Sequence, residues 1–208
     1  MAITSRDILA KLSIPYGPRG RRLRVHYTHL LKGLPEGNDM NIKQKSRILV
    51  LLTLAALSTS AWAVEEGDTA PIFDLPSIYA GNPAISSASL AGKTVYIDFW
   101  ASWCAPCLTS LPLYNDMYNK YKDQGLEVVA INVDNPIEDG LDFLIDTPLD
   151  FLIPTDPDGE AAELFEVIGM PTSYLIQPDG TVTLVHMGFR SGDIEMIEEA
   201  IQSSLAGN

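Results

Sequence analysis

A chain of 208 residues is long enough for one domain with a sizeable core, and its composition is that of a globular protein. Its charge is uneven: residues 1–63 hold ten of the 14 Lys and Arg residues, whereas the rest of the chain holds 24 of the 27 Asp and Glu residues. This strongly acidic remainder argues against nucleic acid and anionic membrane surfaces as its partners.

The basic N-terminal part contains the pattern of a secretory signal peptide over residues 40–63. Three Lys and Arg residues between 43 and 47 form a basic start, and an apolar run over residues 48–57 follows. The run is shorter than the roughly 20 residues that span a bilayer. Ala61-Trp62-Ala63 then offers the small residues at which a signal peptidase cleaves. We therefore predict export to the periplasm and cleavage after Ala63, with a membrane-anchored form if the signal is not cleaved.

Residues 1–39 precede this signal, although a signal peptide ordinarily opens a protein. We predict that this disordered extension comes from an over-assigned start codon and that Met40 is the true first residue. Two alternatives stay open: an unusually long basic start to the signal, and an arm that binds nucleic acid or membrane through the Arg-rich residues 19–24. The folded domain is assigned to residues 64–208.

The folded part opens with an extended stretch over residues 70–75. Residues 94–100 (TVYIDFW) and 126–132 (LEVVAIN) are rich in β-branched and apolar side chains, which predicts two buried strands. Between them, apolar residues at positions 111, 114, 118 and 121 recur at helical spacing. A strand, a helix and a strand in this order predict a βαβ unit with parallel strands.

Further along the chain, residues 137–146 and 160–165 are predicted to be helical and residues 151–154 extended. Residues 172–176 and 181–186 predict the strands of a hairpin, because Pro178-Asp179-Gly180 between them is a strong turn signal. Ser191 is expected to cap a final helix with an apolar stripe at positions 194, 197, 201 and 205. The predicted fold class is α/β, with a central mixed sheet flanked by helices.

The folded part has two cysteines, and two residues separate them. A disulfide that closes so short a loop adds little stability, which indicates a chemical role for the pair. The pair comes at the start of a helix, where unpaired N–H groups and partial positive charge favour a thiolate. This pattern predicts thiol–disulfide exchange, with Cys104 as the attacking thiol and the more deeply set Cys107 as the resolving thiol.

Other uses of a C-x-x-C pair fit these residues less well. Structural zinc needs four ligands, whereas the folded part offers two cysteines and His186. Covalent haem attachment needs a histidine directly after the second cysteine, and this position is Leu108. We predict an enzyme without metal or cofactor. A copper-binding assembly factor that uses Cys104, Cys107 and His186 stays open as an alternative from another class of protein.

Residues 99–107 (FWASWCAPC) resemble the active-site signature of thioredoxins, and most of all that of the exported TlpA/ResA-like thiol–disulfide oxidoreductases. Pro112, residues 169–172 (GMPT) and the insertion over residues 133–165 match further features of this family. The resemblance covers residues 68–205. It implies a thioredoxin fold with an N-terminal extension and a central insertion.

The resemblance also implies roles for individual residues. Asp98 aligns with the buried acid of thioredoxin, whose raised pKa would suit transfer of the resolving thiol's proton. Trp103 would cover the disulfide. Pro171, if its peptide bond is cis, would place the backbone of Met170 where it can pair with an extended substrate peptide. The predicted substrate-binding residues are Trp103, Ala105, Pro106, Met170 and Pro171.

Two features bear on the direction of the reaction and on its substrate. Ala105-Pro106 resembles the motif of reductases more than the His-containing pair of strong oxidants. We therefore predict reduction of disulfides in exported proteins or in apocytochrome c, with electrons from a membrane-embedded thiol donor. An oxidase that donates its disulfide is the alternative. Ser110 occupies a position at which many members of the family carry an acid, which weakens the case for a role dedicated to cytochrome c maturation.

Overall fold

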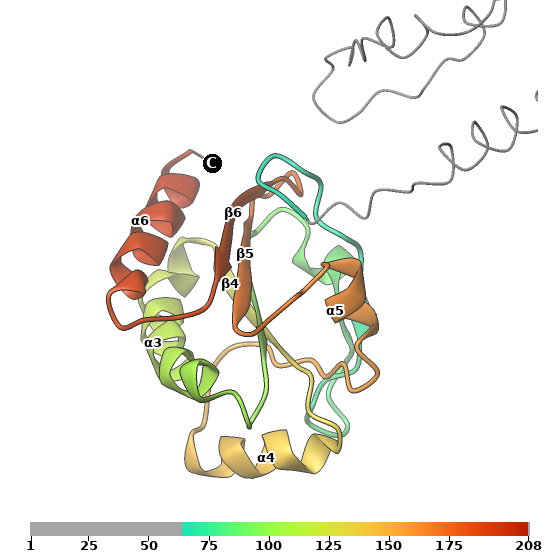
Figure 1. Cartoon of the computed structure of the whole chain (residues 1–208). Coiled ribbons are helices and arrows are strands. Elements are labelled where there is room, and N and C mark those ends of the chain that lie inside the picture. Colours follow the sequence, from blue (N-terminus) through green and yellow to red (C-terminus); the bar gives the residue numbers. More distant parts are fainter. Residues whose placement is uncertain (1–63, 208) are drawn as a thin grey trace, which may run out of the picture. The chain divides into compact units, whose positions relative to one another are not determined.

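The computed structural model describes residues 64–207, so the predicted extension (1–39) and signal peptide (40–63) lie outside the described residues (Figure 1). The strands are β1 Asp74–Leu75, β2 Ile85–Ser86, β3 Thr94–Trp100, β4 Leu126–Asn132, β5 Thr172–Ile176 and β6 Val182–Met187. The helices are α3 Ala105–Tyr121, α4 Ile137–Asp146, α5 Glu160–Leu164 and α6 Asp193–Ala206, with the 3-10 turns η2 Ser87–Leu90 and η3 Lys122–Gln124. None of the helices within residues 64–207 has the length and apolar character that crossing a membrane requires.

A four-stranded mixed sheet in the order β4-β3-β5-β6 forms the centre of the fold. β3 and β4 run parallel, as the βαβ pattern predicts, because α3 returns the chain to the same end of the sheet. β5 pairs antiparallel with both β3 and β6, and the predicted hairpin joins β5 to β6. α3 and α6 lie together on one face of the sheet and α5 on the other (Figure 1). The predicted mixed sheet flanked by helices is confirmed.

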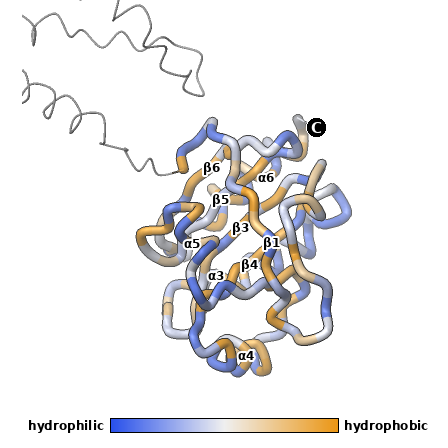
Figure 2. Tube along the Cα trace, turned by 90° about the vertical axis from the view of Figure 1, so that its right-hand side faces the viewer, coloured by the Kyte–Doolittle hydropathy of each residue, from blue (hydrophilic) through white to orange (hydrophobic). Residues whose placement is uncertain are grey.

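Two apolar cores form on either side of β3, because successive side chains of a strand point to opposite faces. Tyr96 and Trp100 pack with α3 and α6, whereas Val95 and Ile97 pack beneath the N-terminal segment and α5. Every residue of β3 and β4 is buried. Figure 2 shows hydrophilic and hydrophobic residues alternating around α4, as expected for a helix that covers the core with one face.

One local prediction is wrong. Ser191 does not cap the last helix, because α6 begins at Asp193 after Gly192 and no side chain caps its first turn. The backbone N–H of Arg190 instead donates to the carboxylate of Asp193 at 2.8 Å, which tightens the turn before the helix. The residue pattern suggested a cap one position too early, since the turn and not the hydroxyl determines where the helix starts.

Candidate active site

The two cysteines lie at the N-terminus of α3, as predicted, and they form a disulfide. Cys104 is the N-cap residue, and its Sγ accepts a hydrogen bond from the backbone N–H of Cys107 at 3.3 Å. Pro106 stands in the first turn of the helix, where a missing N–H breaks no helical hydrogen bond. In the reduced protein the same N–H and the helix dipole favour a thiolate at Cys104.

The two cysteines differ in exposure in the direction that their predicted roles require. Cys104 is 6% exposed, whereas Cys107 is fully buried. An incoming disulfide therefore reaches Cys104 first, and Cys107 is held one turn further into the helix. Ser110 is also fully buried, and its hydroxyl donates to the backbone carbonyl of Cys107 at 3.0 Å.

The predicted substrate-binding residues lie on two separate segments of the chain. Trp103 is 68% exposed, and Ala105 and Pro106 next to the disulfide are exposed as well. Met170 is half-buried and packs against the core cluster that contains both cysteines. The bond from Met170 to the buried Pro171 is cis, which is the geometry that the family resemblance implies.

Two exposed apolar residues flank the Met170 segment and were not singled out from the sequence. Ile168 precedes Met170 by two residues and is 85% exposed. Met187, which is 63% exposed, lies opposite Thr172 on the neighbouring strand. Exposed apolar side chains that gather near a reactive site mark an interaction surface. No sequence pattern distinguishes them from core residues, because both lie in apolar stretches.

A buried carboxylate that the sequence analysis missed holds the segment before Cys104. The backbone N–H and the hydroxyl of Ser102 each donate to the Asp134 carboxylate at 2.9 Å. The amide of Asn132 donates a further hydrogen bond to Asp134 at 2.7 Å. Gly140 of α4 approaches Asn132 so closely that a β-carbon there would lie 2.7 Å from the amide nitrogen. The end of β4 and α4 thus fix the active-site loop.

Asp98 lies in the middle of β3 and is fully buried on the face that packs against α3. Its Oδ1 accepts a hydrogen bond from the Ser173 hydroxyl at 2.6 Å, and its Oδ2 has no partner among the described residues. Burial raises the pKa of this carboxyl to about 7, and the bond from Ser173 opposes that rise. An acid with a pKa near neutrality can take up and return a proton under working conditions.

Residues 66–185 match the AhpC/TSA family, which is more than half of the chain. The chain belongs to the AhpC/TSA family. It is 32% identical over 153 residues to the thiol–disulfide oxidoreductase ResA of Oceanobacillus iheyensis, an alignment that covers 69% of this chain and 80% of the relative. It is also 32% identical over 126 residues to ResA of Bacillus subtilis, over 61% of this chain and 69% of the relative.

Solved structures agree with this assignment. A thiol:disulfide interchange protein DsbE from Chlorobium tepidum is similar, with a TM-score of 0.66 and 43% identity over 69% of this chain and 99% of that chain. A thioredoxin from Neisseria meningitidis is also similar, with a TM-score of 0.56 and 30% identity. This match covers 67% of this chain and 93% of that chain. This AhpC/TSA protein is thus a thiol–disulfide oxidoreductase with a thioredoxin fold, and both predictions are confirmed.

His186 does not join the two cysteines of this AhpC/TSA protein in a metal site. Within residues 64–207, no group of three or more His, Cys, Asp and Glu side chains could hold a metal ion. The Nε2 atom of His186 lies 3.3 Å from the Asp193 carboxylate instead. The copper-binding alternative that uses Cys104, Cys107 and His186 therefore has no site in the described part of the chain.

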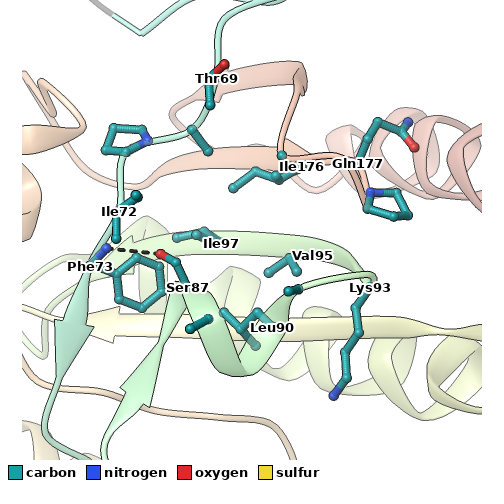
Figure 3. Close-up of a pocket in the computed structure, with 16 residues that line it drawn as sticks. Thr69, Ile72, Phe73, Ser87, Leu90, Lys93, Val95, Ile97, Ile176 and Gln177 are labelled. Atoms are coloured by element: carbon teal, nitrogen blue, oxygen red, sulfur yellow. Dashed lines mark hydrogen bonds between the residues drawn. The ribbon is translucent and has the colours of Figure 1, made fainter.

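A cavity of about 340 Å³ lies against one face of the sheet (Figure 3). Val95 and Ile97 of β3, Ile176 of β5 and residues 69–73 contribute to its mainly apolar lining. The residues of β3 that line it alternate with Asp98, so they point to the other side of the strand. None of the predicted site residues lines this cavity, and it is not part of the redox site.

The stability of the protein should depend on the ionisation of Asp98. The folded protein, with a pKa of about 7 at this carboxyl, keeps a proton that the unfolded chain releases near the ordinary value of 3.8. Ionisation of this carboxyl should therefore lower the free energy of unfolding as the pH rises from about 4 to 7. The decrease should reach up to about 4 kcal/mol, and the carboxyl should cause no further decrease at pH values above this range. Urea unfolding at several pH values measures the effect.

Asp98→Asn should remove this contribution and make the protein more stable at pH 8. Asp116→Asn is the matched control, because Asp116 is an exposed residue of α3, the helix that packs on the same face of the sheet as Asp98. This variant should keep the pH dependence of the wild-type stability. Equal pH dependence in the wild type and Asp98→Asn would contradict the raised pKa.

Proposed function

We propose that this oxidoreductase reduces disulfides in exported proteins. The observation that carries the proposal is the environment of Cys104, whose Sγ accepts one backbone N–H while the two residues between the cysteines are Ala105 and Pro106. A histidine between the cysteines would stabilise the thiolate further and make the disulfide a stronger oxidant. Without it the reduced pair is less stabilised, which favours the donation of electrons to a substrate.

The proposed reaction has two steps. The Cys104 thiolate attacks one sulfur of the substrate disulfide, so that a mixed disulfide forms and the other substrate sulfur leaves as a thiolate. Cys107 then loses its proton and attacks Cys104, which forms the enzyme disulfide and releases the second substrate sulfur. Two electrons have passed from the enzyme dithiol to the substrate. A membrane-embedded thiol donor would restore the dithiol.

Asp98 is proposed as the base that takes the proton of Cys107. Both residues are fully buried on the α3 side of the sheet, where bulk water does not reach the resolving thiol. The raised pKa of Asp98 leaves part of the carboxyl ionised at neutral pH and makes that fraction a stronger base than an exposed carboxylate.

The substrate is proposed to be an extended polypeptide with apolar side chains near its disulfide. Trp103, Pro106 and Ile168 offer exposed apolar contact area. The backbone of Met170 would pair with the peptide in the manner of an added strand. Apocytochrome c fits this description as one candidate among exported proteins.

The reduction potential of the Cys104–Cys107 pair tests the direction of electron flow. We expect a value near or below about −230 mV when the purified protein is equilibrated with thiol buffers of known potential. A value near about −120 mV would identify an oxidase that donates its disulfide, and the proposed direction would be wrong.

The order of attack can be tested with single cysteine variants. Cys107→Ser should accumulate a near-stoichiometric mixed disulfide with a disulfide-containing peptide, because nothing displaces the substrate from Cys104. Cys104→Ser is the matched control and should trap almost none, since Cys107 is buried. Mass spectrometry before and after treatment with a reductant measures the adduct. Trapping by Cys104→Ser instead would reverse the assigned roles.

Export can be tested by expressing the full chain in a Gram-negative host. We expect the protein in the periplasmic fraction with Val64 as its first residue, as determined by mass spectrometry. Ala63→Asp should block cleavage, because signal peptidase needs a small residue at this position. An unprocessed wild-type protein in the cytoplasm would contradict export.

A further inference from the structure

Three buried polar atoms without a hydrogen-bond partner within the described residues lie close to the redox site. They are Oδ2 of Asp98 and the hydroxyl oxygens of Tyr96 and Tyr114. All three side chains are fully buried. A buried polar group without a partner is costly, so three of them together call for a physical explanation.

The two tyrosines lie next to each other and next to Asp98. Tyr96 precedes Asp98 by two residues on β3, so both side chains point toward α3. Tyr114 extends from α3, and the centres of the two tyrosine rings are 5.1 Å apart at an angle of 70°. Burial, and after it the negative charge of Asp98, raise the pKa of the Tyr114 hydroxyl. Burial, the charge of Tyr114 and the charge of Asp98 raise the pKa of Tyr96 in the same way.

Within the described residues, no charged side chain from the other elements packed around Asp98 forms an ion pair with it. From β5, Ser173 donates to Oδ1 and leaves Oδ2 untouched. From β6, His186 lies opposite Ser173, but its Nε2 is 3.3 Å from the carboxylate of Asp193 at the start of α6. The salt bridges within residues 64–207 do not include Asp98.

From α3, Cys107 and Ser110 share the core with Tyr114. The hydroxyl of Ser110 donates to the backbone carbonyl of Cys107 and not to Asp98. The two tyrosine hydroxyls are thus buried groups on the α3 side of β3, like Oδ2 of Asp98, and neither has a hydrogen-bond partner within the described residues. Their electrostatic neighbours are each other, Ser173 and Asp98, and for Tyr114 also Ser110.

We propose that Tyr96 and Tyr114 are positioning residues for the redox reaction, because their hydroxyls donate to Oδ2 of Asp98 when this carboxylate carries its charge. A hydrogen bond to the charged form favours that form. The tyrosines thus keep a fraction of Asp98 ionised in an otherwise apolar core, and this fraction is available as a base for Cys107.

This inference rests on the proposed role of Asp98 and deepens it. In the release step the Cys107 thiol gives its proton to Asp98, and the new thiolate attacks Cys104. The Cys104–Cys107 bond forms and the Cys104–substrate bond breaks, so the substrate sulfur leaves with the electron pair. The tyrosine hydroxyls keep their own protons throughout, and their hydrogen bonds to Asp98 weaken once the carboxyl has become neutral.

Tyr96→Phe and Tyr114→Phe test the proposal, each on the full reduced protein without substrate. The carboxyl resonance of Asp98, followed by ¹³C NMR against pH and identified by its loss in Asp98→Asn, reports the titration directly. Each tyrosine variant should move the midpoint upward by about one pH unit, since a lost hydrogen bond to a charged group has about this effect. The pH at which release of a mixed disulfide is half-maximal should move by the same amount.

Tyr121→Phe is the matched control. Its hydroxyl donates to Glu198 and accepts from Gln202 at the far end of α3, so its removal should lower stability without moving the Asp98 midpoint. The proposal is overturned if both tyrosine variants leave this midpoint unchanged and raise the stability against urea, since the hydroxyls would then be truly unpartnered. If instead Asp98→Asn leaves the release rate unchanged while the tyrosine variants shift the midpoint, the proposed role of Asp98 fails and the hydrogen bonds stand.

Discussion

The burial of β3 on both faces is the constraint on which the rest of the structure depends. A strand in the centre of the sheet between two cores cannot expose any side chain to water, so each polar group on it needs a partner inside the protein. Asp98 is the charged residue of this strand, and the Ser173 hydroxyl satisfies one of its two oxygens. The strand ends at Trp100, and the active-site loop follows directly. This fully buried strand therefore carries the buried acid and leads directly into the redox loop.

The site is held from two further sides by segments that are distant in the sequence. The Asp134 carboxylate binds the backbone and hydroxyl of Ser102 from the end of β4. On the other side, the N–H of Gly188 donates to the carbonyl of Pro171 at 2.8 Å. Fixed elements around a reactive centre keep its geometry constant, whereas the exposed Trp103 and Ile168 remain available for contact with a substrate.

The buried acid on the α3 side of the sheet comes from a strand and not from the helix that carries the cysteines. Ser110 occupies a position on α3 at which many TlpA/ResA-like proteins have an acid. In this protein its hydroxyl donates a hydrogen bond to the backbone carbonyl of Cys107. Asp98 provides the carboxyl from β3, in a more apolar setting that raises its pKa. An acid on a central strand is further from water than an acid on a helix, so its protonation depends on the few hydroxyls that surround it.

The sequence alone determined the central strands, the βαβ unit, the hairpin and the place of Cys104 and Cys107 at the start of α3. These features follow from local patterns: side-chain periodicity, turn residues and the spacing of two cysteines. It also predicted the burial of Asp98, because a single acid within TVYIDFW has no exposed face. Only the tertiary structure brought Asp134 to Ser102, Tyr114 to Tyr96, and Met187 to the cis-proline segment. These contacts join residues from different elements, and no local pattern encodes which side chains meet once the helices pack on the sheet.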